Sequence, residues 1–180
     1  MVGIVVDSCC DLTKELIDKY NVAVVPFKMT IESKDYVDDE NLDLEEFINN
    51  MRTSKQAVVT ACPSPLEFKE AILSRNSKEV FVITITSKLS GSYNSAMVAK
   101  QMVEEENKDI KVHVLDSLAA GAGEVALFYK LVELKDKMNF HELVENMEAN
   151  RDSMKLYFIL DKFDNLVKNG RMGKVASKVA

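Results

Sequence analysis

Apolar and polar positions along the chain form blocks that favour strands and helices in alternation. A continuous apolar run, typical of a strand covered on both faces, occupies residues 79–86, and further strands are expected at 2–6 and 110–115. Segments with apolar residues three and four positions apart predict amphipathic helices. These helices are expected at 12–20, 42–52, 63–75, 92–106, 122–137 and 139–152. The alternation predicts an α/β fold with a mainly parallel sheet flanked by helices.

Smaller features refine this pattern. Residues 21–31 form a second extended run, and Pro26 within it suggests an edge or an irregularity. A short hairpin arm is expected at 34–38. Asp11 is placed to cap the helix at 12–20, and the carboxylates that open the helix at 42–52 suit its dipole.

The last segment, 154–180, starts another strand, followed by a short helix and the glycine-bracketed turn NGRMG. A strand and helix without a further partner are typical of the opening of a second unit. We therefore expect an α/β domain over 1–153 and the beginning of a second, truncated domain over 154–180.

Composition narrows the function classes. Hydrophobic residues make up 47% of the 180 residues, which excludes a disordered chain. No apolar run is long enough to span a bilayer, so stable membrane insertion is not expected. The net charge of −6 argues against nucleic-acid binding. Three cysteines do not form a disulfide framework, and no signal peptide is apparent, so the expected compartment is the cytoplasm.

Polar residues gather where the expected strands end. Asp7-Ser8 follows the first strand, the segment 86–92 follows the strand at 79–86, and Asp116-Ser117 follows the next. The stretch 60–65 (TACPSP) leads into a helix. Ligands of open parallel sheets bind beyond the carboxyl ends of the strands, so these groups are expected on one rim.

The turn at 87–92 (SKLSGS) leads into a helix N-terminus, where free N–H groups and the helix dipole favour an anion. Gly91 would let a ligand approach the backbone closely. Ordinary capping by Ser90 or Ser92 is the simpler alternative. The turn lacks the glycine and lysine spacing of a phosphate-binding loop, and no GxSxG or GxGxxG motif is present.

Other chemistry-bearing residues have structural interpretations. His113 lies within a strand and His141 on a helix, so both are expected to be structural. Cys62 is either a buried thiol or a reactive one at the site rim. An acidic group between 38 and 46 matches no metal loop, and solvation together with helix-dipole stabilisation explains it. Its members are Asp38, Asp39, Glu40, Asp43, Glu45 and Glu46.

Five segments together resemble the DegV family over the whole length of the chain. They are DSCCDL, TACPSP, SKLSGSYNSA, LDS and NLVKNGRM, in the family's order and rough spacing. Family members run roughly a hundred residues longer, about the size of a further small domain, in line with the expectation of an incomplete second domain.

The resemblance implies a bacterial fatty-acid-binding protein without catalytic residues, metal or cofactor other than the bound fatty acid. It implies that Thr60 and Ser90 bind the carboxylate. The turn itself adds the Gly91 N–H as an assisting donor and Ser87 as a weaker candidate. It places Arg171 at the domain junction or the partner surface. The implied partners are a long-chain fatty acid and the catalytic subunit of a fatty acid kinase.

The chain departs from the family pattern at Ala61 and Cys62, which remove a hydroxyl and an amide from the expected rim. Candidate residues for lining the acyl tail are Phe27, Met97 and Phe128. A sixteen-carbon tail would contribute about 12 kcal/mol of gross burial energy, at ~0.8 kcal/mol per methylene, before the entropy of binding is subtracted.

Two alternatives remain open. One is an enzyme for a phosphorylated small metabolite, with a phosphate cradle at 87–92 and Asp7 or Asp116 as general acid or base. The other is a pure interaction module that holds no ligand.

Overall fold

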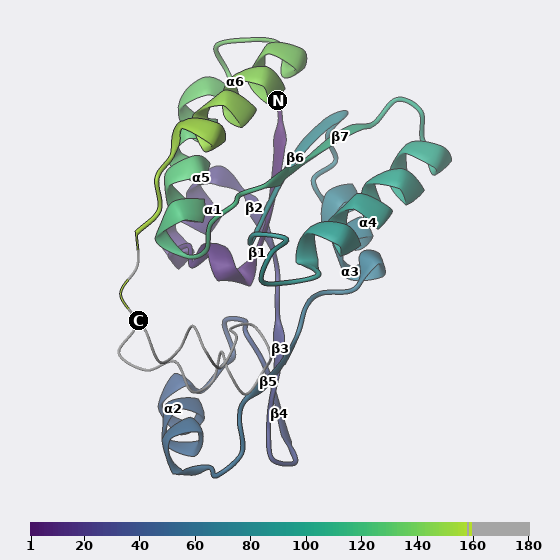
Figure 1. The fold of residues 1–180 in the computed structure, drawn as a ribbon. Helices are drawn as coiled ribbons and strands as arrows, with labels where there is room; N and C mark the ends of the chain where they lie inside the picture. Colours follow the sequence, from purple (N-terminus) through teal and green to yellow (C-terminus); the bar gives the residue numbers. More distant parts are fainter. Residues whose placement is uncertain (158, 160–180) are drawn as a thin grey trace. The chain divides into compact units, whose positions relative to one another are not determined.

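The computed structural model describes residues 1–157 and 159, and Figure 1 shows its elements. Within this part of the chain, two compact units are distinguished. The larger contains Met1–Pro26 and Cys62–Leu156, and the smaller contains Phe27–Ala61. The predicted boundary at 153/154 stays a prediction, because the segment after it lies almost entirely outside the described residues.

The larger unit is built on a four-stranded parallel sheet in the order β2-β1-β6-β7. Its strands are β1 (Gly3–Asp7), β2 (Val22–Val25), β6 (Glu79–Thr84) and β7 (Lys111–Asp116). Every neighbouring pair is parallel. All carboxyl ends therefore lie at the same edge, and the predicted mainly parallel α/β fold is confirmed.

Helices cover both faces of this sheet (Figure 1). One face carries α1 (Lys14–Tyr20), α5 (Ala122–Leu134) and α6 (Phe140–Ser153). The other carries α3 (Pro65–Ser74) and α4 (Ser92–Glu106). These helices follow the predicted segments closely, and α4 begins and ends at the predicted residues.

Alternating strand residues divide the core into two clusters. On β6, Phe81 and Ile83 pack with the α5 and α6 side, while Val80 and Val82 pack with the α3 and α4 side. All four side chains are fully buried. Burial on both faces explains why the sequence here is apolar without interruption, and each such side chain contributes about 1.5–3 kcal/mol of transfer free energy.

The smaller unit holds an antiparallel sheet in the order β4-β3-β5, with one helix. Its elements are β3 (Lys28–Ile31), β4 (Lys34–Val37), α2 (Leu44–Thr53) and β5 (Val59–Ala61). The predicted hairpin at 34–38 is confirmed as the β3–β4 pair. The irregularity predicted at Pro26 is confirmed, because the extended run over 21–31 is interrupted at Pro26 and Phe27. Only the continuity of the run was wrong, since its two halves join different sheets.

The expected cap of the first helix was also wrong. Asp11 adopts the left-handed conformation (φ 51°) and ends a short 3-10 helix, Ser8–Cys10. Thr13 caps α1 instead, since its side chain accepts a hydrogen bond from the Leu16 N–H. Asp11 therefore belongs to the turn between β1 and α1, and the cap of α1 lies two residues later than the sequence suggested.

No helix within the described residues is long and apolar enough to cross a membrane.

Candidate functional site

The candidate site is the turn that joins β6 to α4. Two of its backbone N–H groups, from Leu89 and Ser90, donate to the carbonyl of Thr86 at 3.0 and 3.2 Å. The Ser90 hydroxyl in turn accepts the N–H of Ser92 at 3.2 Å. These bonds fold the serine-rich segment back on itself and direct the first turn of α4 toward the carboxyl edge of the sheet.

The N-terminus of α4 keeps unsatisfied donors. The N-cap is Gly91, which has no side-chain hydrogen bond to offer, so the expected capping by Ser90 or Ser92 in its usual form is absent. Within the described part of the chain, no protein group accepts the N–H groups of Gly91, Tyr93 and Asn94. Free N–H groups at the positive end of a fifteen-residue helix form an arrangement that suits an anion.

A buried carboxylate fixes this helix end to the sheet. Asp7, the last residue of β1, is fully buried. Its Oδ2 accepts a hydrogen bond from the Ser92 hydroxyl at 2.6 Å and from the Ile85 N–H at 3.0 Å. The turn is therefore held at both its start and its end by one side chain from the neighbouring strand.

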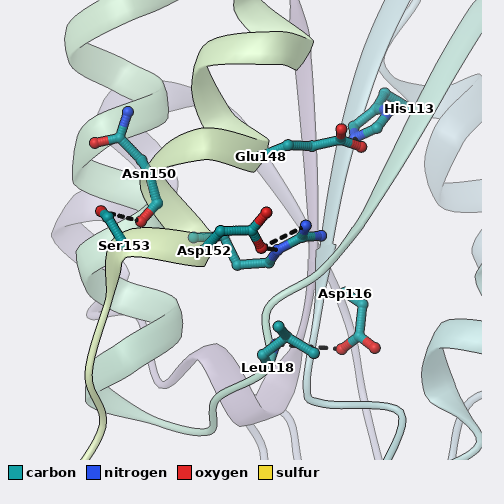
Figure 2. A network of polar contacts seen from close by, with 8 residues as sticks. His113, Asp116, Leu118, Glu148, Asn150, Asp152 and Ser153 are labelled. Atoms are coloured by element: carbon teal, nitrogen blue, oxygen red, sulfur yellow. Dashed lines mark hydrogen bonds and ion pairs between the residues drawn. The ribbon is translucent and has the colours of Figure 1, made fainter.

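A second aspartate holds the other side of the turn. Asp116, the last residue of β7, accepts hydrogen bonds from the N–H and the hydroxyl of Ser87, at 3.0 and 2.5 Å. It also accepts the N–H of Leu118 at 3.2 Å, as Figure 2 shows. The strand-end residues of the larger unit thus meet at one rim, as the sequence predicted.

Cys62 lies against the same turn. A Cβ atom placed on Gly91 would come within 3.2 Å of the Cys62 Sγ atom, which is tighter than ordinary van der Waals contact. The lead-in to α3 and the lead-in to α4 are therefore in close contact, and a side chain at position 91 would displace the thiol. The half-buried Cys62 thiol is a packing neighbour of the candidate site.

The residues proposed to bind the carboxylate have different environments. Ser90 is half-buried and Gly91 is exposed on the turn, whereas Ser87 is exposed but has its hydroxyl committed to Asp116. Thr60 is half-buried in β5 of the smaller unit, where it pairs with Met29. Arg171 lies outside the described residues.

The three candidates for the acyl tail differ as well. Phe128 is fully buried in the core beside α1, and Phe27 is buried in the smaller unit. Met97 is 38% exposed on α4. Their proposed role in lining a tail stays a prediction.

A second buried acid lies next to Asp7. Glu124, in the first turn of α5, is fully buried. Burial, and then the charge of Asp7, raises the pKa of Glu124 to about 9. Burial also raises the pKa of Asp7, although the bonds from Ser92 and Ile85 oppose this shift. Burial raises the pKa of the neighbouring Cys10 thiol, and the charges of Glu124 and Asp7 add to that shift.

Sequence analysis missed Glu124. It lies three, four and seven positions before Leu127, Phe128 and Leu131, all of which are buried on α5. A glutamate on the apolar stripe of a helix is the signal that could have identified it.

His113 has the structural environment that the sequence suggested. Its ring centroid lies 4.9 Å from that of Phe81. Its Nε2 atom is 3.6 Å from a Glu148 oxygen, and Figure 2 shows these two side chains facing each other. Burial, together with the charges of Lys100 and Arg151, lowers its pKa to about 4. The ring is therefore neutral and packed at neutral pH.

Within the described residues, no group of three or more histidine, cysteine, aspartate or glutamate side chains is arranged to hold a metal ion. In the acidic group at 38–46, Asp43 caps α2 by accepting the Glu46 N–H at 2.9 Å.

Comparison with known proteins gives consistent matches. A family model for the DegV family, described as uncharacterised proteins, matches residues 1–180. A DegV domain-containing protein of Streptococcus pneumoniae is 40% identical over 179 residues, which are 98% of this chain and 63% of the relative. The chain thus spans less than two thirds of the length of this relative.

Many solved structures are similar to this fold, including two that carry fatty acids. The crystal structure of a DegV family protein from Ruminococcus gnavus, refined with vaccenic acid, superposes with a TM-score of 0.90 at 33% identity, covering 96% of this chain and 62% of that one. The Fatty Acid Kinase (Fak) B3 protein of Streptococcus pneumoniae, loaded with linoleic acid, superposes with a TM-score of 0.89 at 37% identity. The match covers 100% of this chain and 64% of that one.

The family resemblance carried by the five sequence segments is thereby confirmed over the whole chain. The chain belongs to the DegV family.

Proposed function

We propose that this chain binds one long-chain fatty acid and holds its carboxylate at the turn between β6 and α4. The observation that carries the proposal is the N-terminus of α4. There the N–H groups of Gly91, Tyr93 and Asn94 have no acceptor within the described residues and lie near the Ser90 hydroxyl. A carboxylate needs donors and positive potential but no catalytic base, and these groups supply both.

The similar structures support this ligand class. The Ruminococcus gnavus protein was refined with vaccenic acid and the pneumococcal Fak B3 protein was loaded with linoleic acid. Both are long-chain fatty acids, and both proteins align with nearly all of this chain. In the proposal the buried tail provides most of the affinity and the polar groups orient the carboxylate.

In this proposal Thr60 and Ser90 donate their hydroxyls to the carboxylate, and Gly91 donates its N–H. Ser87 contributes less, because its hydroxyl already donates to Asp116. Arg171 adds positive charge at the domain junction or the partner surface.

We further propose a non-catalytic role beside a kinase. The similarity to the Fak B3 protein supports a fatty acid kinase catalytic subunit as the partner to which the carboxylate is presented. No cofactor is needed for this role. The site of action in this proposal is the cytoplasm, where the kinase partner would meet the protein.

The environments of Asp7 and Asp116 weigh against a phosphate-cradle enzyme. A general acid or base must reach its substrate. Asp7 is fully buried, and Asp116 already accepts hydrogen bonds from Ser87 and Leu118. A phosphate ester bound by the purified protein in place of a fatty acid would restore that alternative.

The test is Ser90→Ala in the full-length protein. Loss of one hydrogen bond to a charged group costs about 1.5–3 kcal/mol, so the dissociation constant for oleate should rise at least tenfold. Isothermal titration of the delipidated protein measures it. Ser95→Ala, three residues into the same helix, is the matched control and should bind as the unmodified protein does. Equal affinities for both variants would contradict the assignment of Ser90.

A further inference from the structure

Three buried carboxyl oxygens in the core of the larger unit have no hydrogen-bond partner within the described part of the chain. They are Oδ1 of Asp7 and both side-chain oxygens of Glu124. Both residues are fully buried. Two ionised carboxylates side by side cannot hydrogen-bond to each other, and each unpaired buried charge is costly.

The surroundings supply no cation in the described part of the chain. Asp7 ends β1, and the groups that act on it are the Ser92 hydroxyl of α4, the Ile85 and Cys9 N–H groups and Glu124. The charge of Asp7 acts on Glu124, and the nearby Gly121 N–H donates to the Cys9 carbonyl at 3.1 Å. The other titratable groups nearby, Cys10 and Asp11 beside the 3-10 helix, are neutral or acidic.

One proton resolves this arrangement. If Glu124 keeps its proton, its O–H can donate to Asp7, within whose hydrogen-bonding reach it lies. Two of the three unpaired oxygens then become donor and acceptor of one bond. Asp7 stays negative, and its other oxygen remains available to the Ser92 hydroxyl and the Ile85 N–H.

We propose that Asp7 and Glu124 share one proton, and that this pair is a positioning device for the carboxylate-binding turn. The hydrogen bond between Asp7 and Ser92 links the orientation of Asp7 to the start of α4. Ser92 is the first residue of α4, directly after Gly91, and its own N–H is held by Ser90. A protonated Glu124 thereby fixes the orientation of Asp7, and Asp7 fixes the helix end that presents the donors.

The positioning role rests on the proposed function, because it assumes that the turn binds a carboxylate. The shared proton itself is a property of the core and can be measured without any ligand. The two parts therefore need separate readouts.

The first readout is infrared spectroscopy of the full-length protein at neutral pH. A C=O band of a protonated carboxyl group is expected, which disappears in Glu124→Gln. The exposed Glu70 provides the matched control, because Glu70→Gln should leave the band unchanged. Absence of the band, or its persistence in Glu124→Gln, would overturn the shared proton.

The second readout is the dissociation constant for oleate. Glutamine keeps a donor for Asp7, so Glu124→Gln should bind within about twofold of the unmodified protein. Glu124→Ala removes the donor and should bind about tenfold more weakly, as expected for loss of a hydrogen bond to a charged group. If glutamine proves as damaging as alanine, the positioning role is refuted.

The outcomes separate the two proposals. A protein that shows the Glu124 band but takes up no oleate refutes the proposed function and leaves the shared proton standing. Should Glu124→Ala fail to fold, the infrared comparison of the unmodified protein with Glu124→Gln still decides the shared proton, and the affinity of Glu124→Gln decides the positioning role, because a loss of tenfold would refute it.

Discussion

The hydrogen bond between Ser92 and Asp7 allows the most detailed prediction. The Ser92 Oγ atom lies 2.6 Å from Asp7 Oδ2, and both side chains are fully buried. Ser92→Ala removes the donor but leaves the carboxylate in place. The bond from the Ile85 N–H to that oxygen remains in place.

The expected cost follows from the burial and charge of the acceptor. A hydrogen bond to a charged group contributes about 1.5–3 kcal/mol. Alanine has the better helix propensity, which returns about half a kcal/mol. The free energy of unfolding should therefore fall by about 2 kcal/mol.

Urea unfolding followed by circular dichroism measures this loss as a lower midpoint with an unchanged slope. A double-mutant cycle isolates its cause. In an Asp7→Asn background the acceptor is neutral, so Ser92→Ala should cost only about 1 kcal/mol. Ser95→Ala is the control on the same helix and should stay within about 0.5 kcal/mol. A cost for Ser92→Ala that is below 0.5 kcal/mol, or equal in both backgrounds, would refute the reasoning.

Three further predictions concern packing, titration and capping. Gly91→Ala should lower stability by about 1 kcal/mol because its Cβ meets the Cys62 Sγ atom, and Cys62→Ala should relieve that cost in thermal unfolding. Since the pKa of His113 is lowered to about 4, the unfolded chain binds more protons between pH 4 and 6.5. The free energy of unfolding should therefore fall as the pH drops through that window, by at most ~1.4 kcal/mol per pH unit. In His113→Gln this pH dependence, measured by urea unfolding at several pH values, should be smaller. Ser64→Ala removes the capping box at the start of α3 and should cost about 1 kcal/mol in urea unfolding, and an unchanged midpoint would contradict the assigned cap.

Much of the larger unit could be predicted from the sequence because its signals are local. The run at 79–86 is apolar on both faces and has few alternatives to a buried strand, and α4 begins directly after the serine-rich turn as expected. Strand ends in a parallel sheet share one edge, so the meeting of Asp7 and Asp116 with the turn was also predictable.

What could not be predicted depends on tertiary contacts. Pro26 marks an irregularity in the extended run at 21–31, but only pairing with other strands shows that its halves join different sheets. Asp11 and Thr13 are both good caps, and the left-handed turn at Asp11 decides between them. Glu124 reads as an ordinary helical glutamate until the neighbouring core shows that it is buried beside Asp7.

The central claim is that the turn between β6 and α4 orients a bound long-chain fatty acid. The most direct measurement is to purify the full-length protein, denature it, extract it with organic solvent and identify the extract by mass spectrometry. The account predicts near-stoichiometric long-chain fatty acid. An empty extract, with no uptake of added oleate or palmitate, would contradict it.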